Sequence, residues 1–296
     1  MDIGHYLNQK RDEVDRFLEK VVPAATMPPT ILHESMRYSL FAGGKRVRPI
    51  LAMAAAEAVG HCPPALWPVA CSLELIHTYS LIHDDLPAMD NDDYRRGKLT
   101  NHKVYGNAMA ILAGDALLTL AFELCSQREL LNGLEPAGQV RIVYELAVGS
   151  GHVGMVGGQV FDIQAENQDI DMATLQRIHR HKTGMLIRAA VRMGAIVAGA
   201  TPAQLTALTG YAEEVGLAFQ VADDVLNVTG TREELGKNAN TDAQRGKKTY
   251  PTFLGVDGAR TFADECVTRA IGHLTSFETK ADPLRELATY ITARKN

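Results

Sequence analysis

The sequence predicts an all-α protein, and three features of its 296 residues support that prediction. Sustained alternation of apolar and polar residues, the pattern of a half-buried strand, is nearly absent. Alanine and leucine, which are good helix formers, are abundant. Apolar residues recur at helical spacing through most of the chain, in segments separated by turns that contain Gly, Asn or Pro. The length is near the upper limit for one continuous core, so we expect one domain over residues 1–296.

Glycine and proline mark the boundaries of the predicted helices. Gly43-Gly44 should end the first helix, and Pro49, which is tolerated in a first helical turn, should open the second. The stretch 229–251 is polar and basic, so we expect a mobile loop of the kind that can close over a site as a lid. The spacing of apolar residues predicts helices over 31–40, 50–59, 65–83, 107–131, 139–164, 172–200, 203–228 and 284–294.

Composition and charge exclude several classes of protein. The formal net charge of -5 argues against a nucleic-acid partner, which requires a positive face. The four cysteines show no CxxC spacing, so we expect reduced thiols and a cytoplasmic location. The N-terminus has no apolar h-region, and the most apolar stretch, 108–122, is interrupted by Asp115 and too short to span a bilayer. We therefore expect no signal peptide and no membrane span.

An acidic segment with two arginines at its end follows the predicted helix over 65–83. Its aspartates would repel one another unless a cation shared the site, and their hard oxygens suit Mg²⁺. Pro87 should end the helix and let Asp90 fold back toward Asp84. The adjoining arginines suit a polyanion that shares its phosphate oxygens with the metal, whereas a solvated acidic turn is the alternative. The segment comprises Asp84, Asp85, Asp90, Asp92 and Asp93, followed by Arg95 and Arg96.

A second acidic pair, Asp223-Asp224, follows a nearly continuous apolar helix. Positions 220, 223, 224 and 227 share one helical face, so Gln220, Asp223 and Asn227 can address the same cavity. The alternative is a helix that ends at the surface. The apolar character of the rest of this helix disfavours that alternative, because it implies burial of the other faces.

Basic groups near a predicted helix start could hold a second polyanion. The segment GGKRVRP (43–49) places three cations, among them Lys45 and Arg48, beside two glycines that let the backbone approach a ligand. It is no nucleotide-binding loop, because the GxxxxGK[ST] spacing and a preceding strand are missing. A patch of surface charge is the alternative. His77 lies on nearly the same helical face as Asp84, where contact with a diphosphate competes with the ordinary role of a core histidine.

These segments together resemble the short-chain trans-prenyltransferase (polyprenyl synthase) family, in particular its bacterial farnesyl diphosphate synthases. The resemblance covers residues 31–256, with the motifs in the same order and at similar spacing. Seven matches make it specific, whereas an isolated acidic pair would not. The matching segments are GGKRVRP (43–49), LIHDDLPAMDNDDYRRG (81–97), GGQVFD (157–162), HKTG (181–184), FQVADDVLNV (219–228), LGK (235–237) and GKKTYP (246–251).

The resemblance implies a bundle of antiparallel helices around a deep central cavity, with the two acidic segments facing each other across its mouth. It also implies a homodimer. Asp84, Asp85 and Asp90 would bind two Mg²⁺ ions, and Asp223 with Asp224 would bind a third. The family usually has aspartate where this chain has Asn227, so that third ion should be held more weakly. The implied substrate contacts are Arg95, Lys182, Lys237 and Lys247 for the allylic diphosphate, Lys45, Arg48, His77 and Arg96 for isopentenyl diphosphate, and Thr183 and Gln220 for the reacting allylic carbon.

The implied reaction is the condensation of isopentenyl diphosphate with dimethylallyl or geranyl diphosphate to give farnesyl diphosphate. In the resembling family a bulky aromatic at the position of Tyr79, together with the insertion Pro87-Ala88, accompanies a fifteen-carbon product. A helical wheel places Ser80 more directly beneath Asp84. A geranylgeranyl diphosphate synthase, with the same chemistry and a deeper pocket, is the nearest alternative. A noncatalytic prenyltransferase subunit is disfavoured because both carboxylate clusters are present.

Overall fold

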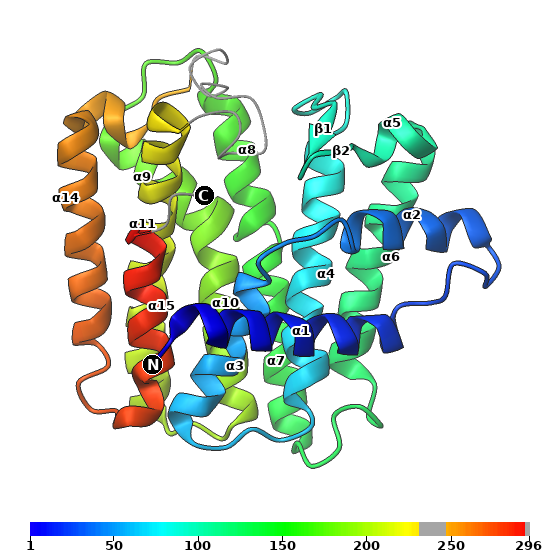
Figure 1. Cartoon of the computed structure of the whole chain (residues 1–296), viewed down its shortest axis with the longest axis horizontal. Coiled ribbons are helices and arrows are strands. Elements are labelled where there is room, and N and C mark those ends of the chain that lie inside the picture. The colour runs from blue at the N-terminus through cyan, green and yellow to red at the C-terminus, as the bar shows by residue number, and fades with distance from the viewer. Residues whose placement is uncertain (231–246, 294–296) are drawn as a thin grey trace.

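The computed structural model describes residues 1–230 and 247–293, which form a bundle of helices (Figure 1). The all-α prediction is confirmed, whereas a single domain over 1–296 stays a prediction. The long helices stand side by side, and α1 lies across them. In chain order the elements are α1 (Ile3–Val21), α2 (Thr30–Leu40), α3 (Val47–Val59), α4 (Leu66–Asp84), β1 (Tyr94–Arg95), β2 (Lys98–Leu99), α5 (Asn101–Tyr105), α6 (Asn107–Ser126), α7 (Pro136–Ser150), α8 (Met155–Ala165), α9 (Met172–His179), the π-helical turn η1 (Arg180–Gly184), α10 (Met185–Val197), α11 (Pro202–Thr229), α14 (Tyr250–Gly272), the 3₁₀ turn η2 (Thr279–Ala281) and α15 (Asp282–Ala293).

Most predicted helices are present, and the differences have local causes. The prediction of one helix over 139–164 was wrong, because the chain leaves α7 and re-enters a helix at α8. At Gly154, between them, an added Cβ would overlap the carbonyl oxygen of Val148, so this turn requires glycine. Neither α1 nor α14 was among the predicted helices. Only a few residues of α1 are buried, so its apolar periodicity is sparse in the sequence.

A short β-hairpin over 94–99 was also not predicted. Its strands pair antiparallel, with Arg95 opposite Lys98. The two turn residues, Arg96 and Gly97, have φ of 53° and 75°, and positive φ at both positions matches the twist of a two-residue hairpin. Because Arg95 lies in the strand β1 and Arg96 lies in the turn, the hairpin holds these two adjacent arginines in different positions.

Two clusters of buried apolar side chains form the core, and α3 and α10 contribute to both. On α3, Ala52 and Met53 belong to one cluster, and Ala54 and Ala55 belong to the other. α10 packs closely on α3 at Gly194, where an added Cβ would overlap the Ala52 carbonyl oxygen and lie 2.9 Å from its Cα. The two clusters are therefore joined through a tightly packed helix pair.

The helix α6 corrects one expectation. Within residues 1–230 and 247–293, it is the one helix that is long and apolar enough to cross a membrane by length and composition. From the sequence, its apolar stretch was expected to be too short for that, and on length that expectation was wrong. It runs for 20 residues, and 44% of its most apolar window is buried. It packs on α4 and α2, and Asp115 lies on its exposed side. Packing against these helices accounts for the apolar residues on its buried side.

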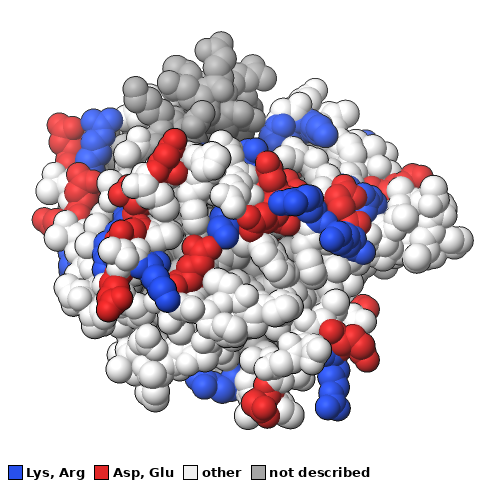
Figure 2. Space-filling model, turned by 60° about the horizontal axis from the view of Figure 1, so that its bottom comes forward, with Lys and Arg blue, Asp and Glu red and all other residues white. Residues whose placement is uncertain are grey.

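Charged groups of both signs are interspersed on the face of the molecule drawn in Figure 2. No continuous basic surface is visible on that face, which has broad uncharged areas. That view agrees with the formal net charge of -5. The expected lack of a nucleic-acid partner stays a prediction.

The helices that carry the two acidic segments end at the same end of the bundle (Figure 1). α4 ends at Asp84. α11 begins with a capping box formed by Thr201 and Gln204 and runs for 28 residues, so Asp223 lies near its C-terminal end. The long helices thus bring carboxylates far apart in the sequence to one end of the molecule.

Candidate active site

The first acidic segment folds back on itself where α4 ends. The Asp90 N–H donates to the Asp84 carbonyl at 2.8 Å, so the expected return of Asp90 toward Asp84 is confirmed. The N–H groups of Met89 and Asn91 both donate to the Leu86 carbonyl and tighten the same turn. The local turn therefore groups aspartates that six residues separate.

Asp85 is paired with Arg95 from the hairpin. Its side chain is buried, and Arg95 Nε donates to both carboxylate oxygens, at 2.8 and 2.9 Å. Arg95 Nη2 also donates to one of them at 2.6 Å. Burial raises the pKa of Asp85, and the hydrogen bonds and positive charge of Arg95 oppose that rise. The pair keeps a guanidinium group beside the aspartates, where it could bind a phosphate together with a metal ion.

Asp84 occupies an environment that favours an added cation. Burial raises the pKa of its carboxyl to about 6; the neighbouring Asp90 and Asp85 add to the rise, and Lys182 and Arg95 oppose it. Within the part of the chain that the structure describes, no group of three or more His, Cys, Asp or Glu side chains forms a ready metal cage. Mg²⁺ does not require one, because it typically takes one or two carboxylates and completes its octahedron with water and phosphate oxygens. The donor set therefore fits Mg²⁺ bound together with a diphosphate.

The two aspartates on α11 have different surroundings. Asp224 is buried, and its Oδ2 accepts a hydrogen bond from the Tyr250 N–H at 2.9 Å, which caps the start of α14. Asp223 lies near Arg48: burial lowers the pKa of that guanidinium, and the negative charge of Asp223 acts in the opposite sense. The structure thus gives Asp224 a capping contact and places Asp223 near Arg48 at the start of α3. Their metal-binding roles stay predictions.

Electrostatic contacts connect the two halves of the site. Lys182 in η1 lowers the pKa of Asp84 at the end of α4, against the larger effect of burial. Burial lowers the pKa of Lys247, beside the start of α14, whereas Asp162 and, to a smaller extent, Asp90 raise it. Such effects decay with distance, so the first acidic segment faces the lysines across the bundle end. Lys237 lies outside the described residues.

Asp162 on α8 is a site residue that the sequence analysis missed. Its Oδ2 accepts hydrogen bonds from both Lys182 Nζ and Lys247 Nζ, each at 2.7 Å. Burial by itself would raise the pKa of Asp162, but the two ammonium groups lower it to about 2. The residue ends the motif GGQVFD, which was matched, but nothing in that segment indicated which cations it would meet. Asp162 therefore holds together Lys182 and Lys247, the two lysines expected to bind the allylic diphosphate.

The π-helical turn η1 positions Lys182 and Thr183. A π-turn shifts the register of a helix locally and often marks a functional site. Thr183 Oγ1 donates to Gln220 Oε1 on α11, so the two residues expected beside the reacting carbon are brought together. Gly158 on α8 lies against the Lys182 backbone, where an added Cβ would sit 2.5 Å from its Cα. That close approach is what places α8 and its carboxylate at the turn.

The residues expected to hold isopentenyl diphosphate gather around the loop before α3. Arg96 Nη1 donates to the Gly43 carbonyl in this loop, and the neighbouring Lys45 is exposed. Arg48 Nε is buried, and the described residues offer it no hydrogen-bond acceptor. Burial, followed by Arg48 and Arg96, lowers the pKa of His77 well below its ordinary value, so its imidazole is neutral near pH 7. A buried guanidinium donor without an acceptor among the described residues, close to other cations, indicates a site for an anion.

Tyr79 and Ser80 have different partners on α4. Tyr79 is buried in the core and makes an edge-to-face contact with His83, whose Nε2 donates to the Ile111 carbonyl on α6 at 3.0 Å. Burial, and then the charge of Asp84, raises the pKa of Tyr79 to about 12. Ser80 donates to the His77 carbonyl of its own helix, at 2.9 Å. The bulky ring therefore lies in the core on the α6 side, close enough to Asp84 to sense its charge.

Comparisons with known proteins agree with this site. Residues 29–286 match the polyprenyl synthetase family, and the chain belongs to that family. It is 49% identical over 294 residues to a dimethylallyltranstransferase of Fischerella ambigua (strain UTEX 1903), covering 99% of this chain and 84% of that relative. It is 41% identical to a farnesyl diphosphate synthase of Geobacillus stearothermophilus, covering 99% of this chain and 98% of that one.

The fold has a solved counterpart. An apo crystal structure of an FPP/GFPP synthase from Zymomonas mobilis superposes with a TM-score of 0.87 at 38% sequence identity, over 98% of this chain and 99% of that one. Other relatives of comparable identity are named geranylgeranyl pyrophosphate synthases. The chain therefore has the all-α isoprenoid synthase fold and is a short-chain prenyltransferase, and the resemblance inferred from the motifs is confirmed.

Proposed function

We propose that this chain is a Mg²⁺-dependent farnesyl diphosphate synthase that condenses isopentenyl diphosphate with dimethylallyl or geranyl diphosphate. The observation that carries the proposal is the grouping, at one end of the bundle, of aspartates with two separate sets of cations. One set, Lys182 and Lys247, is joined through Asp162, and it interacts electrostatically with Asp84 and Asp90. The other lies at the loop before α3. Two anionic substrates require two such cationic sites beside one metal-binding region.

The proposed metal ligands are Asp84, Asp85 and Asp90 on one side and Asp223 with Asp224 on the other, for three Mg²⁺ ions. When bound, Mg²⁺ supplies Lewis-acid stabilisation of the negative charge on the departing diphosphate. The raised pKa of Asp84, to about 6, reflects burial of a carboxylate near others, and a metal ion would relieve that cost. Arg95 beside Asp85 would share the same phosphate oxygens.

The chain's own residues would orient the substrates and exclude water. Arg95, Lys182 and Lys247 would hold the allylic diphosphate, while Lys45, Arg48, His77 and Arg96 would hold isopentenyl diphosphate. The allylic C–O bond breaks, its electron pair leaves with diphosphate, and the alkene of isopentenyl diphosphate forms the new C–C bond with the allylic cation. A proton then leaves the resulting cation to the released diphosphate. No protein nucleophile is needed, and Thr183 with Gln220 would lie beside the reacting carbon.

The fifteen-carbon product is proposed from Tyr79. Its ring is buried just before the acidic segment, in edge-to-face contact with His83, which donates to the Ile111 carbonyl on α6. A chain extended past fifteen carbons would have to displace that ring. Relatives named geranylgeranyl pyrophosphate synthases make the twenty-carbon product the second candidate. Product length is therefore the measurement that separates the two.

The proposal is tested with the purified chain, Mg²⁺, isopentenyl diphosphate and each allylic starter, with products sized by chromatography. We expect farnesyl diphosphate, loss of activity with a chelator, and recovery on adding Mg²⁺. D84A and D223A should each lower kcat by at least about a hundredfold, because each removes a proposed ligand of the Mg²⁺ that would stabilise the departing diphosphate. D115A, which removes an exposed aspartate on α6, is the control. Full activity in a chelator would refute the metal role, and inactivity of the wild-type chain alone would favour a noncatalytic subunit.

We also propose a cytoplasmic homodimer. Its support is the exposure of large apolar side chains on the adjoining helices α6 and α7, namely Ile111, Leu112, Val140 and Tyr144. Exposed apolar side chains on neighbouring helices can form a contact between subunits. Light scattering on the purified chain should give twice the mass of one chain, and L112E should shift it to one.

A further inference from the structure

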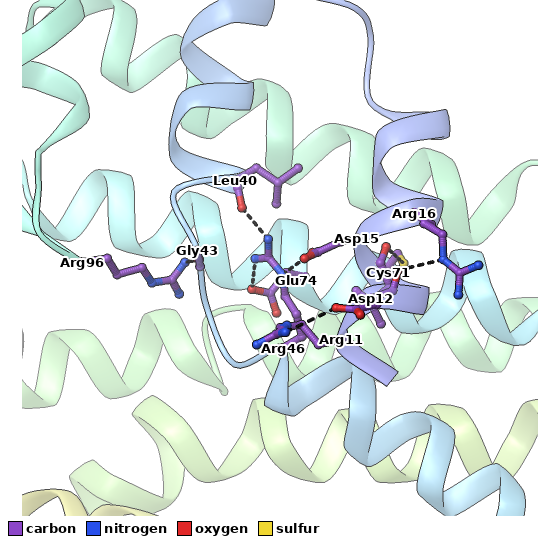
Figure 3. Close-up of polar contacts among 11 residues, drawn as sticks. Arg11, Asp12, Asp15, Arg16, Leu40, Gly43, Arg46, Cys71, Glu74 and Arg96 are labelled. Carbon is purple, nitrogen blue, oxygen red and sulfur yellow. Dashed lines mark hydrogen bonds and ion pairs between the residues drawn. The ribbon is translucent and has the colours of Figure 1, made fainter. Parts of the chain in front are cut away.

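Arg46, one of the three cations in GGKRVRP, points into the protein interior. Its side chain is 1% exposed and lies against Glu74 of α4, which is 2% exposed (Figure 3). All three guanidinium nitrogens donate hydrogen bonds. Nε donates to Asp15 on α1, Nη1 to Glu74 on α4 and Nη2 to the Leu40 carbonyl at the end of α2, each at 2.8 Å. One side chain therefore ties the loop before α3 to three helices.

The backbone of that loop needs such a tie. Arg46 is the N-cap of α3 and has φ 51° and ψ 35°, a left-handed conformation that is unfavourable for a residue with a side chain. Lys45 comes directly before Arg46, and Arg48 lies two residues after it in the first turn of α3. The backbone turn at Arg46 sets the direction of both side chains. The buried contacts of Arg46 therefore determine where the cationic groups of Lys45 and Arg48 lie.

Glu74 also acts on two further arginines. Burial lowers the pKa of Arg48 and of Arg96, and in both cases the negative charge of Glu74 opposes that lowering. Arg96 also donates to the Gly43 carbonyl in the tied loop, and its guanidinium carbon lies 3.0 Å from where a Cβ of Gly44 would be. His77 follows Glu74 by one turn of α4.

We propose that the buried Arg46–Glu74 pair is a positioning device for the diphosphate of isopentenyl diphosphate, acting through Lys45, Arg48 and Arg96 without touching the substrate. The inference rests on the proposed function, because it assigns a role within that substrate site. The pair connects the loop before α3, the helix α4 and Arg96 of the hairpin. These parts must keep fixed distances from one another if two or more cations are to bind one diphosphate. The allylic side has a separate anchor in Asp162.

The test replaces both members of the pair by methionine, as R46M/E74M. The double change leaves the net charge unchanged, and replacing a buried ion pair by apolar groups of similar size is often neutral or stabilising, whereas a single change leaves an unpaired buried charge. We expect the KM for isopentenyl diphosphate to rise about tenfold or more, with the KM for the allylic diphosphate and kcat changed less than about threefold. The dissociation constant for isopentenyl diphosphate, measured by calorimetry, should rise by a similar factor.

A matched control is the pair Arg192–Glu145, which joins α10 to α7. Arg192 Nε and Nη2 donate to the two Glu145 carboxylate oxygens at 2.8 and 2.6 Å, and the side chains are 17% and 8% exposed. R192M/E145M therefore removes a comparable ion pair away from the loop before α3. We expect its effect on the KM for isopentenyl diphosphate to stay within about twofold. A merely structural role for Arg46–Glu74 would make the two double variants alike.

A second variant, R46K, tests the proposal if R46M/E74M does not fold. R46K keeps the charge, but one ammonium group cannot reproduce the planar fork that reaches three acceptors, so the KM for isopentenyl diphosphate should rise about threefold. An R46K value within about 1.5-fold of wild type, or an unchanged or tighter dissociation constant in the folded R46M/E74M, overturns the proposal. If wild-type protein neither binds isopentenyl diphosphate nor turns over, the proposed function fails. Wild-type activity with unaffected variants refutes the positioning role alone.

Discussion

The change Asp162→Asn should lower stability in a pH-dependent way. In the folded protein the carboxylate accepts hydrogen bonds from Lys182 and Lys247, and its pKa is lowered from 3.8 to about 2, since the two ammonium groups outweigh the effect of burial. A depressed carboxyl pKa contributes stability that is present above the unfolded value and is lost as the pH falls through the folded value. That lowering of the pKa from 3.8 to about 2 corresponds to roughly 2 kcal/mol near pH 7 and to about half of that at pH 3.

Urea unfolding followed by circular dichroism measures this effect. D162N should reduce the free energy of unfolding by about 2 kcal/mol at pH 7, and the difference from wild type should shrink to about 1 kcal/mol at pH 3. D169N is the matched control, because Asp169 pairs with Lys248 at 3.3 Å but is 96% exposed. An exposed pair contributes little, so D169N should change stability by less than about 0.5 kcal/mol at either pH. A pH-independent loss in D162N, or equal losses in both variants, would refute the assignment of Asp162 as the charge partner of two lysines.

Two further predictions concern the pocket and the core. Y79A should allow products longer than fifteen carbons because it removes the buried ring on α4, whereas Y79F, which keeps the ring, should not; chromatography of the products decides, and unchanged lengths in Y79A would contradict the stopper role. G194A should destabilise the fold by about 1–3 kcal/mol, because its Cβ would overlap the backbone of Ala52 on α3. G272A, at a site with open space, should be close to neutral in the same thermal unfolding experiment, and equal effects of the two would argue against tight packing of α10 on α3.

The carboxylates of the site could be predicted because their clustering is local in the chain. Asp84 and Asp90 are six positions apart with Pro87 between them, so sequence spacing alone indicated that the chain would turn and bring them together. Thr183 and Gln220 were predicted to meet only through the resemblance, since no local pattern relates two different helices. Their hydrogen bond is made by the packing of η1 against α11.

The partners of isolated charges could not be predicted. Asp162 is one acidic residue in a helical segment, and only the tertiary structure shows that two lysines, 20 and 85 positions away, donate to it. Arg46 carries the opposite lesson. In the sequence it belongs to a row of three cations, yet its left-handed backbone turns it into the core toward Glu74. A charge pattern does not state which side of the backbone each charge occupies.

The amino-acid sequence by itself determined that this protein is helical and that its carboxylates and cations fall in a few segments at helix ends, because helical periodicity, proline and glycine act over a few residues. The tertiary structure alone decided which cation neutralises which carboxylate and which arginine is buried, as well as the hairpin that separates Arg95 from Arg96. Those outcomes depend on distances between helices, and those distances arise from the packing of whole helix faces, which no short stretch of sequence encodes.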